Sequence, residues 1–191
     1  VGAPRKDKKS IKNSVFVIEN GKISSIKDKY ELPNTGVFDE QRIFKQGSLE
    51  DCVDIKGVKF GLPICEDIWE KTVLEKLSKS GAEIIIAINA SPFTVSKNEE
   101  RESVTKLRVK ETKLPIVYLN RTGGQDELIF DGSSFALNHD GKKFYNSSEF
   151  KEETAQISFQ KTNGKWAGQG NLNNNSSSTE RLYKALSLIH I

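Results

Sequence analysis

The sequence is poor in the residue types that mark several classes of protein. It contains no methionine, two cysteines, two histidines and two tryptophans among its 191 residues. Two cysteines are too few for a disulfide scaffold, and neither a Cys-x-x-Cys pair nor clustered histidines predict a zinc site or another metal site. No apolar run approaches the ~18 residues that a membrane-spanning helix needs. These absences exclude a disulfide-rich domain, a zinc module and a transmembrane helix.

Charged residues are abundant, but their signs are balanced. The chain carries 29 Lys and Arg against 26 Asp and Glu, a formal net charge of +3, and the charges are spread along the sequence. This distribution excludes a polybasic nucleic-acid-binding arm. Hydrophobic residues make up 36% of the chain, which is low for a globular core but above the composition of a disordered chain. We therefore expect a folded cytoplasmic protein with neither a nucleic-acid nor a membrane partner.

The two ends of the sequence lead us to expect an internal piece of a longer protein. Residue 1 is Val, no signal-peptide pattern opens the chain, and residues 1–4 have the composition of the end of a buried strand followed by a turn. Residues 160–179 are rich in Asn, Gly and Ser, which predicts a linker. We therefore expect one partial domain over 1–159, a linker over 160–179 and the start of a second domain over 180–191.

Hydrophobic patterning predicts strands that alternate with helices. Strands are expected at residues 14–20, 22–26, 58–65, 82–89, 115–120, 129–130, 133–137, 143–145 and 154–159, and helices at 68–79, 99–112 and 180–186. The nearly continuous isoleucines of 82–89 are typical of a strand covered on both faces. Strands interleaved with helices, together with several hairpins, indicate a mixed α/β layer fold.

Of the two cysteines, Cys65 has an expected position that suggests chemistry. It follows a predicted strand and precedes a helix expected to begin near Asp67, so its side chain would point into a crevice above the sheet, where helix amides favour a thiolate. A cysteine nucleophile is placed in this way. Most free cysteines are small buried hydrophobic residues, however, and both interpretations stay open at this point. Cys52 lies in a polar stretch and is interpreted as structural.

A thiol nucleophile commonly needs a base, which is most often histidine. His139 lies beside an Asp-Gly turn and His190 lies at the end of the sequence. Neither histidine has a suitable place for this role. The base would therefore be a carboxylate or a lysine.

Four segments, in order along the chain, resemble a known family. Residues 29–42 (KYELPNTGVFDEQR) look like the lysine segment of the carbon–nitrogen hydrolase (nitrilase) superfamily, and residues 61–69 (GLPICEDIW) resemble its nucleophile segment. Residues 89–93 (NASPF) and 122–132 (TGGQDELIFDG) are similar to two further signatures. The strings ICEDIW and GGQDEL–FDG are typical of the glutaminase domains of glutamine-dependent NAD+ synthetases. The resemblance covers most of residues 1–160.

The resemblance implies an α-β-β-α sandwich, truncated at its N-terminus, and a Glu-Lys-Cys catalytic set. Cys65 would attack the side-chain amide of L-glutamine, and Lys29 would stabilise the oxyanion. Glu40 would hold the position and charge of the lysine. The family's general-base glutamate is expected before Val1, so we expect this stretch alone to be inactive. Without the motif, Lys29 and Glu40 would be interpreted as solvated surface charges.

The resemblance also implies which residues bind the substrate. Ser91 and Lys97 correspond to family residues that hold glutamine, Lys97 by pairing with a carboxylate. A third position, usually Tyr in the family, is Thr35 here, which removes an aromatic wall. An alternative interpretation of Ser91 is a turn residue that precedes Pro92.

In the intact enzyme, ammonia would pass to an ATP-dependent domain that amidates nicotinic acid adenine dinucleotide to NAD+. ATP and Mg2+ are expected for that domain, with no cofactor in this chain, and the full-length enzyme is expected to be a homo-oligomer. The alternatives are a free-standing nitrilase-type amidase and a non-catalytic interaction domain of the same fold. Residues 186–191 (LSLIHI) leave the family pattern and match a translated sequencing-library transposon end. Our hypothesis is that this tail is not native sequence.

Overall fold

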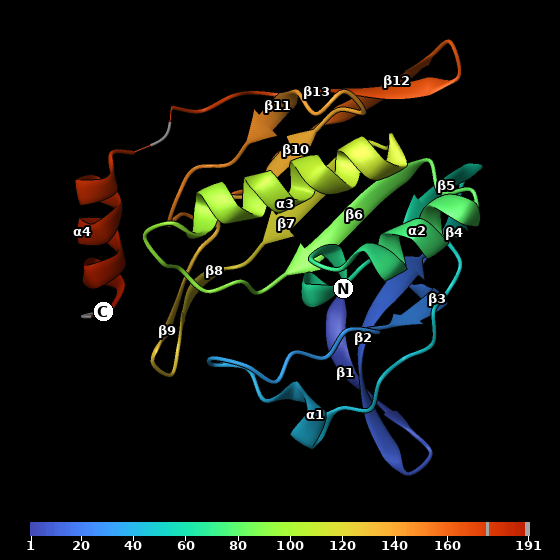
Figure 1. The fold of residues 1–191 in the computed structure, drawn as a ribbon, viewed down its shortest axis with the longest axis horizontal. Helices are drawn as coiled ribbons and strands as arrows, with labels where there is room; N and C mark the ends of the chain where they lie inside the picture. The colour runs from blue at the N-terminus through green and yellow to red at the C-terminus, as the bar shows by residue number, and fades with distance from the viewer. Residues whose placement is uncertain (175, 190–191) are drawn as a thin grey trace.

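A six-stranded mixed sheet forms the centre of the molecule (Figure 1). The computed structural model describes residues 1–174 and 176–189. In the order β11-β10-β7-β6-β5-β4, the strands are Lys143–Asn146, Phe135–Leu137, Ile116–Asn120, Ile84–Asn89, Val58–Gly61 and Val53–Ile55. The three central strands β5, β6 and β7 run parallel, and each outer strand is antiparallel to its inner neighbour.

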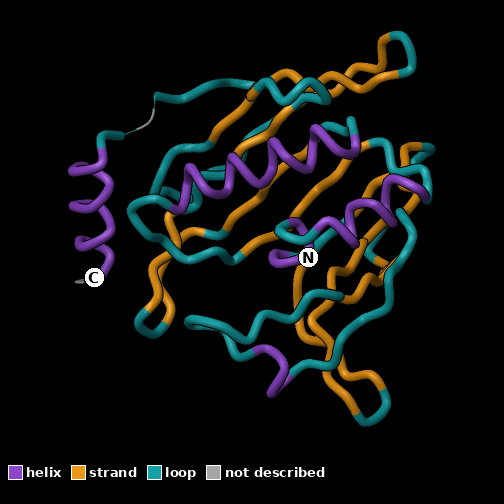
Figure 2. Tube along the Cα trace, viewed as in Figure 1, coloured by secondary structure: helices purple, strands orange, loops and turns teal. Residues whose placement is uncertain are grey.

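Two helices connect the parallel strands and cover one face of this sheet (Figure 2). The helix α2 (Lys71–Lys79) joins β5 to β6, and α3 (Lys97–Thr112) joins β6 to β7. Parallel neighbours need such a crossover connection, because a tight hairpin reverses the chain direction and makes the next strand antiparallel. The apolar side of α2 packs on Ile85 and Ile116 of the sheet in the main hydrophobic core.

A smaller sheet packs on the opposite face. Its antiparallel strands are β1 (Gly2–Asp7), β2 (Ser10–Glu19) and β3 (Lys22–Asp28). Val15 of β2 packs with Ile64, Cys65 and the half-buried Ile88 of β6, so Cys65 lies where the two sheets meet. Helices, large sheet and small sheet therefore form three successive layers.

The predicted mixed α/β fold class is confirmed, but several boundaries differ. Residues 1–4 do not end in a turn: residues 2–4 belong to β1, which runs to Asp7 along β2. The strand expected over 58–65 ends at Gly61, because Pro63 has no N–H to continue the ladder. Cys65–Ile68 form a short 3-10 turn, labelled η1, so the helix expected from residue 68 begins at Lys71.

The predicted linker is wrong over residues 160–169. An antiparallel hairpin of β12 (Ser158–Thr162) and β13 (Lys165–Gln169) lies there, and it also replaces the strand expected at 154–159. Phe159 packs edge-on against Phe144 with ring centroids 5.6 Å apart, and the Trp166 indole donates a hydrogen bond to Glu83 at 3.2 Å. A few well-placed aromatic side chains thus order a segment of otherwise polar composition.

The remaining elements lie at the edges of the molecule. They are α1 (Glu40–Ile43), the hairpin of β8 (Thr122–Gln125) and β9 (Leu128–Asp131), and α4 (Ser178–Ile189). The helix α4 contacts this hairpin. Of the tail whose origin we questioned, residues 186–189 continue α4, whereas His190 and Ile191 lie outside the described residues. None of the helices in the described ranges is long and apolar enough to cross a membrane.

The packing of the β12–β13 hairpin leads to a stability prediction. A Cβ atom added at Gly168 would overlap the Phe144 ring, which would have to leave its place beside Phe159. We expect Gly168→Ala to lower the free energy of unfolding by about 1–3 kcal/mol, the usual cost of overpacking. Urea denaturation measures the change. Gly124→Ala, where the nearest atom would lie 3.9 Å from the new Cβ, is the matched control and should have little effect.

Candidate active site

Cys65 lies at the sharp turn that follows β5. Its φ of 49° is in the left-handed region, which a residue with a side chain adopts at an energetic cost. The turn directs the chain from the sheet into η1, and the residue is 9% exposed. The predicted position of the thiol between a strand and a helical turn is therefore observed, and the backbone there is strained in the way common at functional sites.

A cavity of about 510 Å³ opens beside Cys65. Four of the six predicted site residues line it, namely Thr35, Cys65, Ser91 and Lys97. Its walls come from four parts of the chain: the loop around Thr35, the segment of η1 and Trp69, the segment that leads from β6 into α3, and Leu128 of β9. Segments distant in the sequence are thus brought together around one space of a size suited to a small molecule.

The other two predicted residues form an ion pair in which the lysine is buried and the glutamate partly buried. Lys29 directly follows β3 and is 1% exposed, and its Nζ lies 2.5 Å from Oε1 of Glu40, at the start of α1. The interpretation of Lys29 as a solvated surface charge is therefore wrong. The positive charge of Lys29 lowers the pKa of the Cys65 thiol, so the ammonium acts electrostatically on the sulfur. The structure thus pairs Lys29 with Glu40, and the charges of both residues act on the thiol of Cys65.

The carboxylate of Asp67 joins the lysine segment to the cysteine turn. Its Oδ1 accepts hydrogen bonds from the backbone N–H groups of Tyr30 and Glu31 at 3.1 and 2.8 Å, and its Oδ2 accepts one from Ile64 at 2.9 Å. These donors flank Lys29 on one segment and Cys65 on the other. Asp67 therefore fixes the position of the ammonium relative to the thiol.

Burial dominates the ionisation of the thiol. Burial raises the pKa of Cys65, and the positive charge of Lys29 and a hydrogen bond from the Ala90 backbone only partly offset this effect. The expectation that helix amides favour a thiolate is therefore wrong for this state of the protein, because η1 is a single short turn. The thiol keeps its proton at neutral pH, so a nucleophilic role requires a base.

Lys97 is oriented by two neighbours at the entrance of α3. Its Nζ lies 4.2 Å from the centroid of the Trp69 ring and 3.0 Å from Oε2 of Glu100. The aromatic face and the carboxylate together hold the ammonium at the cavity wall.

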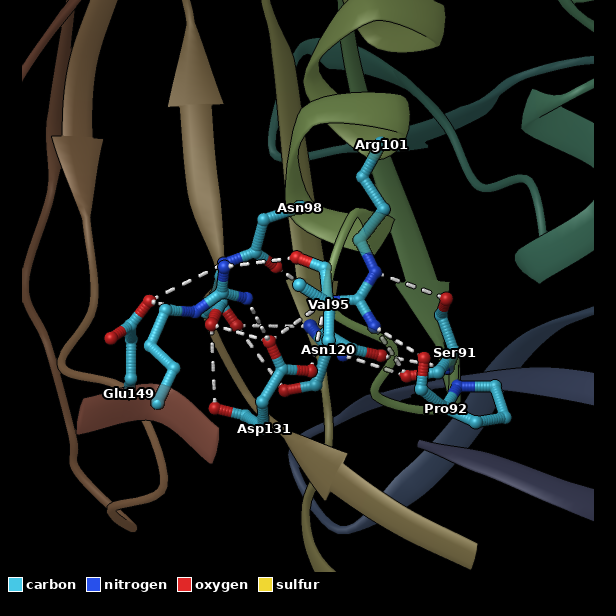
Figure 3. A network of polar contacts seen from close by, with 11 residues as sticks. Ser91, Pro92, Val95, Asn98, Arg101, Asn120, Asp131 and Glu149 are labelled. Carbon is cyan, nitrogen blue, oxygen red and sulfur yellow. Dashed lines mark hydrogen bonds and ion pairs between the residues drawn. The ribbon is translucent and has the colours of Figure 1, made fainter. Parts of the chain in front are cut away.

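Ser91 is held by the buried side chain of Arg101 (Figure 3). Arg101 Nε donates to Ser91 Oγ at 3.0 Å, and Nη2 donates to the backbone oxygens of Ser91 and Pro92 at 2.7 and 2.9 Å. Asn120 Oδ1 accepts a hydrogen bond from the Ser91 N–H at 2.9 Å. The Ser91 hydroxyl accepts from Arg101 and also lies within hydrogen-bonding reach of the buried Tyr118 hydroxyl.

Sequence reasoning missed several of these residues. Trp69 and Glu66 line the cavity, and Arg101 with Asp131 forms a fully buried ion pair at 2.9 Å behind it. In the sequence Arg101 lies in a highly charged helix, where a solvated side chain is the usual interpretation. Arg101 and Asp131 are thirty positions apart in the sequence, so no local pattern predicted that they pair, although Asp131 belongs to the motif of residues 122–132.

Residues 1–167 match the carbon–nitrogen hydrolase family. The chain therefore belongs to this family, and the predicted resemblance and its nitrilase-type fold are confirmed. The roles of the individual site residues stay predictions.

Three relatives illustrate the relationship. The chain is 44% identical over 142 residues to the glutamine-dependent NAD(+) synthetase of Acinetobacter baylyi, covering 74% of this chain and 26% of that protein. Its structure matches the glutamine-dependent NAD+ synthetase of Acinetobacter baumannii with a TM-score of 0.91 and 32% identity, covering 98% of this chain and 36% of that one. A carbon–nitrogen hydrolase of Helicobacter pylori G27 matches with a TM-score of 0.72 and 25% identity, covering 78% and 57%. The chain thus spans only 26% and 36% of the two synthetases.

The buried Asp67 predicts a pH dependence of stability. Burial raises its pKa to about 6 from an ordinary 3.8, although the backbone N–H bonds oppose the shift. Because the folded-state pKa is the higher one, the stabilising contribution of Asp67 is complete below about pH 4 and is lost as the pH rises through about 6. A shift of about two units corresponds to about 3 kcal/mol.

Urea denaturation between pH 4 and 7 measures this effect as the stability of the unsubstituted protein minus that of Asp67→Asn. The asparagine cannot ionise, so the difference isolates the carboxylate from all other titrating groups. We expect the difference to fall as the pH rises. A difference that stays constant or rises with pH would show that the carboxylate ionises freely in the folded protein.

Proposed function

We propose that this chain is the glutamine-hydrolysing part of a glutamine-dependent NAD+ synthetase. The observation that carries the proposal is the buried Lys29, whose charge acts on the thiol of Cys65 at the wall of a cavity that Ser91 and Lys97 also line. A thiol, an ammonium and groups able to bind a carboxylate are what the hydrolysis of an amino-acid amide requires. The names of the Acinetobacter relatives support glutamine as the amide.

In the first step, the base takes the thiol proton and the sulfur of Cys65 attacks the side-chain carbonyl carbon of glutamine. The C–S bond forms and the carbonyl electrons move to oxygen, where the Lys29 ammonium stabilises the negative charge. When the oxyanion collapses, the C–N bond breaks and the nitrogen takes the proton held by the base, so ammonia leaves and a thioester stays on Cys65. Water, deprotonated by the same base, then releases glutamate and restores the thiol. We assign the base to the glutamate that the resemblance predicts before Val1.

The cavity has groups for both charged ends of the amino acid. The Lys97 ammonium and the hydroxyl hydrogen of Ser91 would bind the α-carboxylate, and Glu66, which lines the cavity next to Cys65, would pair with the α-ammonium. Burial raises the pKa of Glu66, and a bound ammonium would favour its ionised form. Thr35 would contact the substrate without the aromatic surface of the family's tyrosine.

In the whole enzyme, the ammonia would amidate nicotinic acid adenine dinucleotide to NAD+ in a second domain that uses ATP and Mg2+. We assign no residue of this chain to those ligands. A cytoplasmic location and a homo-oligomeric state are further parts of this proposal.

A comparison of ammonia sources tests the proposal in the full-length enzyme. Cys65→Ala should abolish NAD+ formation from glutamine and preserve NAD+ formation from ammonium chloride, because the thiol serves only to release ammonia. Cys52→Ala is the matched control and should preserve both activities. Equal loss of both activities in Cys65→Ala would argue against a separate glutaminase site, and glutamine hydrolysis without any NAD+ formation would favour a free-standing amidase.

The alkylation of Cys65 by iodoacetamide tests the electrostatic role of Lys29. Because burial raises the thiol pKa and Lys29 lowers it, Lys29→Met should move the pH–rate profile of alkylation to higher pH. Mass analysis of the peptide that contains Cys65 separates this reaction from alkylation of Cys52. The same variant should reduce glutamine hydrolysis by about 10²–10³-fold through loss of oxyanion stabilisation. An unchanged pH profile would mean that the ammonium does not act on the sulfur.

A further inference from the structure

One side chain of α4 enters the core, although α4 lies outside the family match of residues 1–167. Arg181 is 7% exposed, and its Nε lies 2.9 Å from Oε1 of Glu149 while its Nη2 lies 3.7 Å from Oδ2 of Asp131. Both carboxylates are buried. The helix is therefore attached through a buried charged contact as well as through apolar packing.

Arg181 also contacts the loop that forms one wall of the cavity, from the side opposite the cavity. Its Nη1 donates to the backbone oxygen of Val95 at 3.5 Å, and its guanidinium lies 5.5 Å from the centroid of the Phe93 ring. Phe93 and Ser91 in the same loop line the cavity on the other side. A single residue of α4 thus touches the loop that carries the serine.

The charges behind this loop are balanced in a shared network. Asp131 accepts from Arg101 Nη1 at 2.9 and 3.1 Å, and Arg101 in turn holds Ser91 (Figure 3). Arg181 supplies the second positive charge against Asp131 and Glu149. Without Arg181, two buried carboxylates would share one buried guanidinium, and an uncompensated buried charge is strongly unfavourable.

We propose that Arg181 is a positioning residue for the amino-acid carboxylate subsite, acting through Asp131 and Arg101 on Ser91. Loss of its charge draws Arg101 toward the unpaired carboxylates and releases the Val95 and Phe93 contacts, so the loop no longer holds the Ser91 hydroxyl toward the substrate. Cys65 packs with Val15 on the η1 turn, and it meets the loop at the Ala90 backbone, ahead of Phe93 and Val95, which Arg181 touches; we therefore expect its reactivity to stay unchanged. This inference rests on the proposed function, because it takes glutamine as the ligand of the cavity.

The experiment measures protection of Cys65 by L-glutamine in Arg181→Met. The rate of iodoacetamide alkylation of the Cys65 peptide is followed by mass analysis at increasing glutamine concentration. We expect the concentration that gives half-maximal protection to rise about tenfold, with the rate in the absence of glutamine unchanged. A purely structural effect on the fold would change the unprotected rate as well.

Three further variants test whether the weaker protection comes from loss of the Arg181 charge. Lys184→Met removes a positive charge from the same helix, where Lys184 pairs at 2.8 Å with the exposed Glu180, and it should leave protection unchanged. Arg181→Lys retains the charge but not the fork of donors and should have an intermediate effect. Glu149→Gln combined with Arg181→Met restores the charge balance and should recover part of the lost affinity. If Arg181→Met does not fold, these last two variants carry the test.

The outcomes separate this inference from the function on which it rests. If glutamine protects Arg181→Met and the unsubstituted protein equally, Arg181 has no positioning role and the proposed function stands. If Arg181→Met changes the alkylation rate without glutamine by the same factor as the glutamine concentration that gives half-maximal protection, its role is structural and the inference is wrong. If glutamine does not protect the unsubstituted protein, the proposed function itself fails.

Discussion

The arrangement of the site depends on three hydrogen bonds to one carboxylate. Asp67 accepts backbone N–H groups from Tyr30 and Glu31 on the segment after β3 and from Ile64 on the segment after β5. Those segments belong to different sheets, and each carries one reactive group. Packing of Val15 against Ile88 brings the two sheets together, but apolar contacts are not directional and would tolerate small shifts. The hydrogen bonds of Asp67 are directional. They therefore fix the position of the segment that carries Lys29 relative to the segment that carries Cys65.

Two ion pairs, one partly and one fully buried, support different sides of the cavity. Lys29 with Glu40 lies on the side of the thiol, and Arg101 with Asp131 lies behind the loop that bears Ser91. Buried pairs contribute little net stability, because desolvation offsets most of their attraction. What they provide is fixed geometry: the first pair places a charge near the atoms that would react, and the second places a hydroxyl where a carboxylate would bind. Different ion pairs therefore support the thiol side and the serine side of the cavity.

Sequence patterns predicted those features that repeat along the chain, and they missed those that depend on long-range pairing. The nearly continuous isoleucines of β6 predicted a strand covered on both faces, and hydrophobic patterning over residues 68–79 predicted the helix α2. The turn after β5 placed Cys65 correctly. Lys29 was found only through its motif, since a lysine flanked by Asp28 and Tyr30 carries no local sign of burial. The β12–β13 hairpin was missed because its order comes from Phe159 and Trp166 reaching partners far away in the sequence. Arg101 was missed for the same reason.

The left-handed backbone at residue 65 limits which nucleophiles this scaffold can carry. A second heavy atom on Cβ makes a positive φ especially unfavourable, so a threonine at this position would force the turn to change. Serine and cysteine, with a single γ atom, are compatible with it. Of the two small hydroxyl-bearing residues, only serine could therefore replace the thiol without a change of the turn. The backbone conformation at residue 65 thus restricts which nucleophile can evolve there.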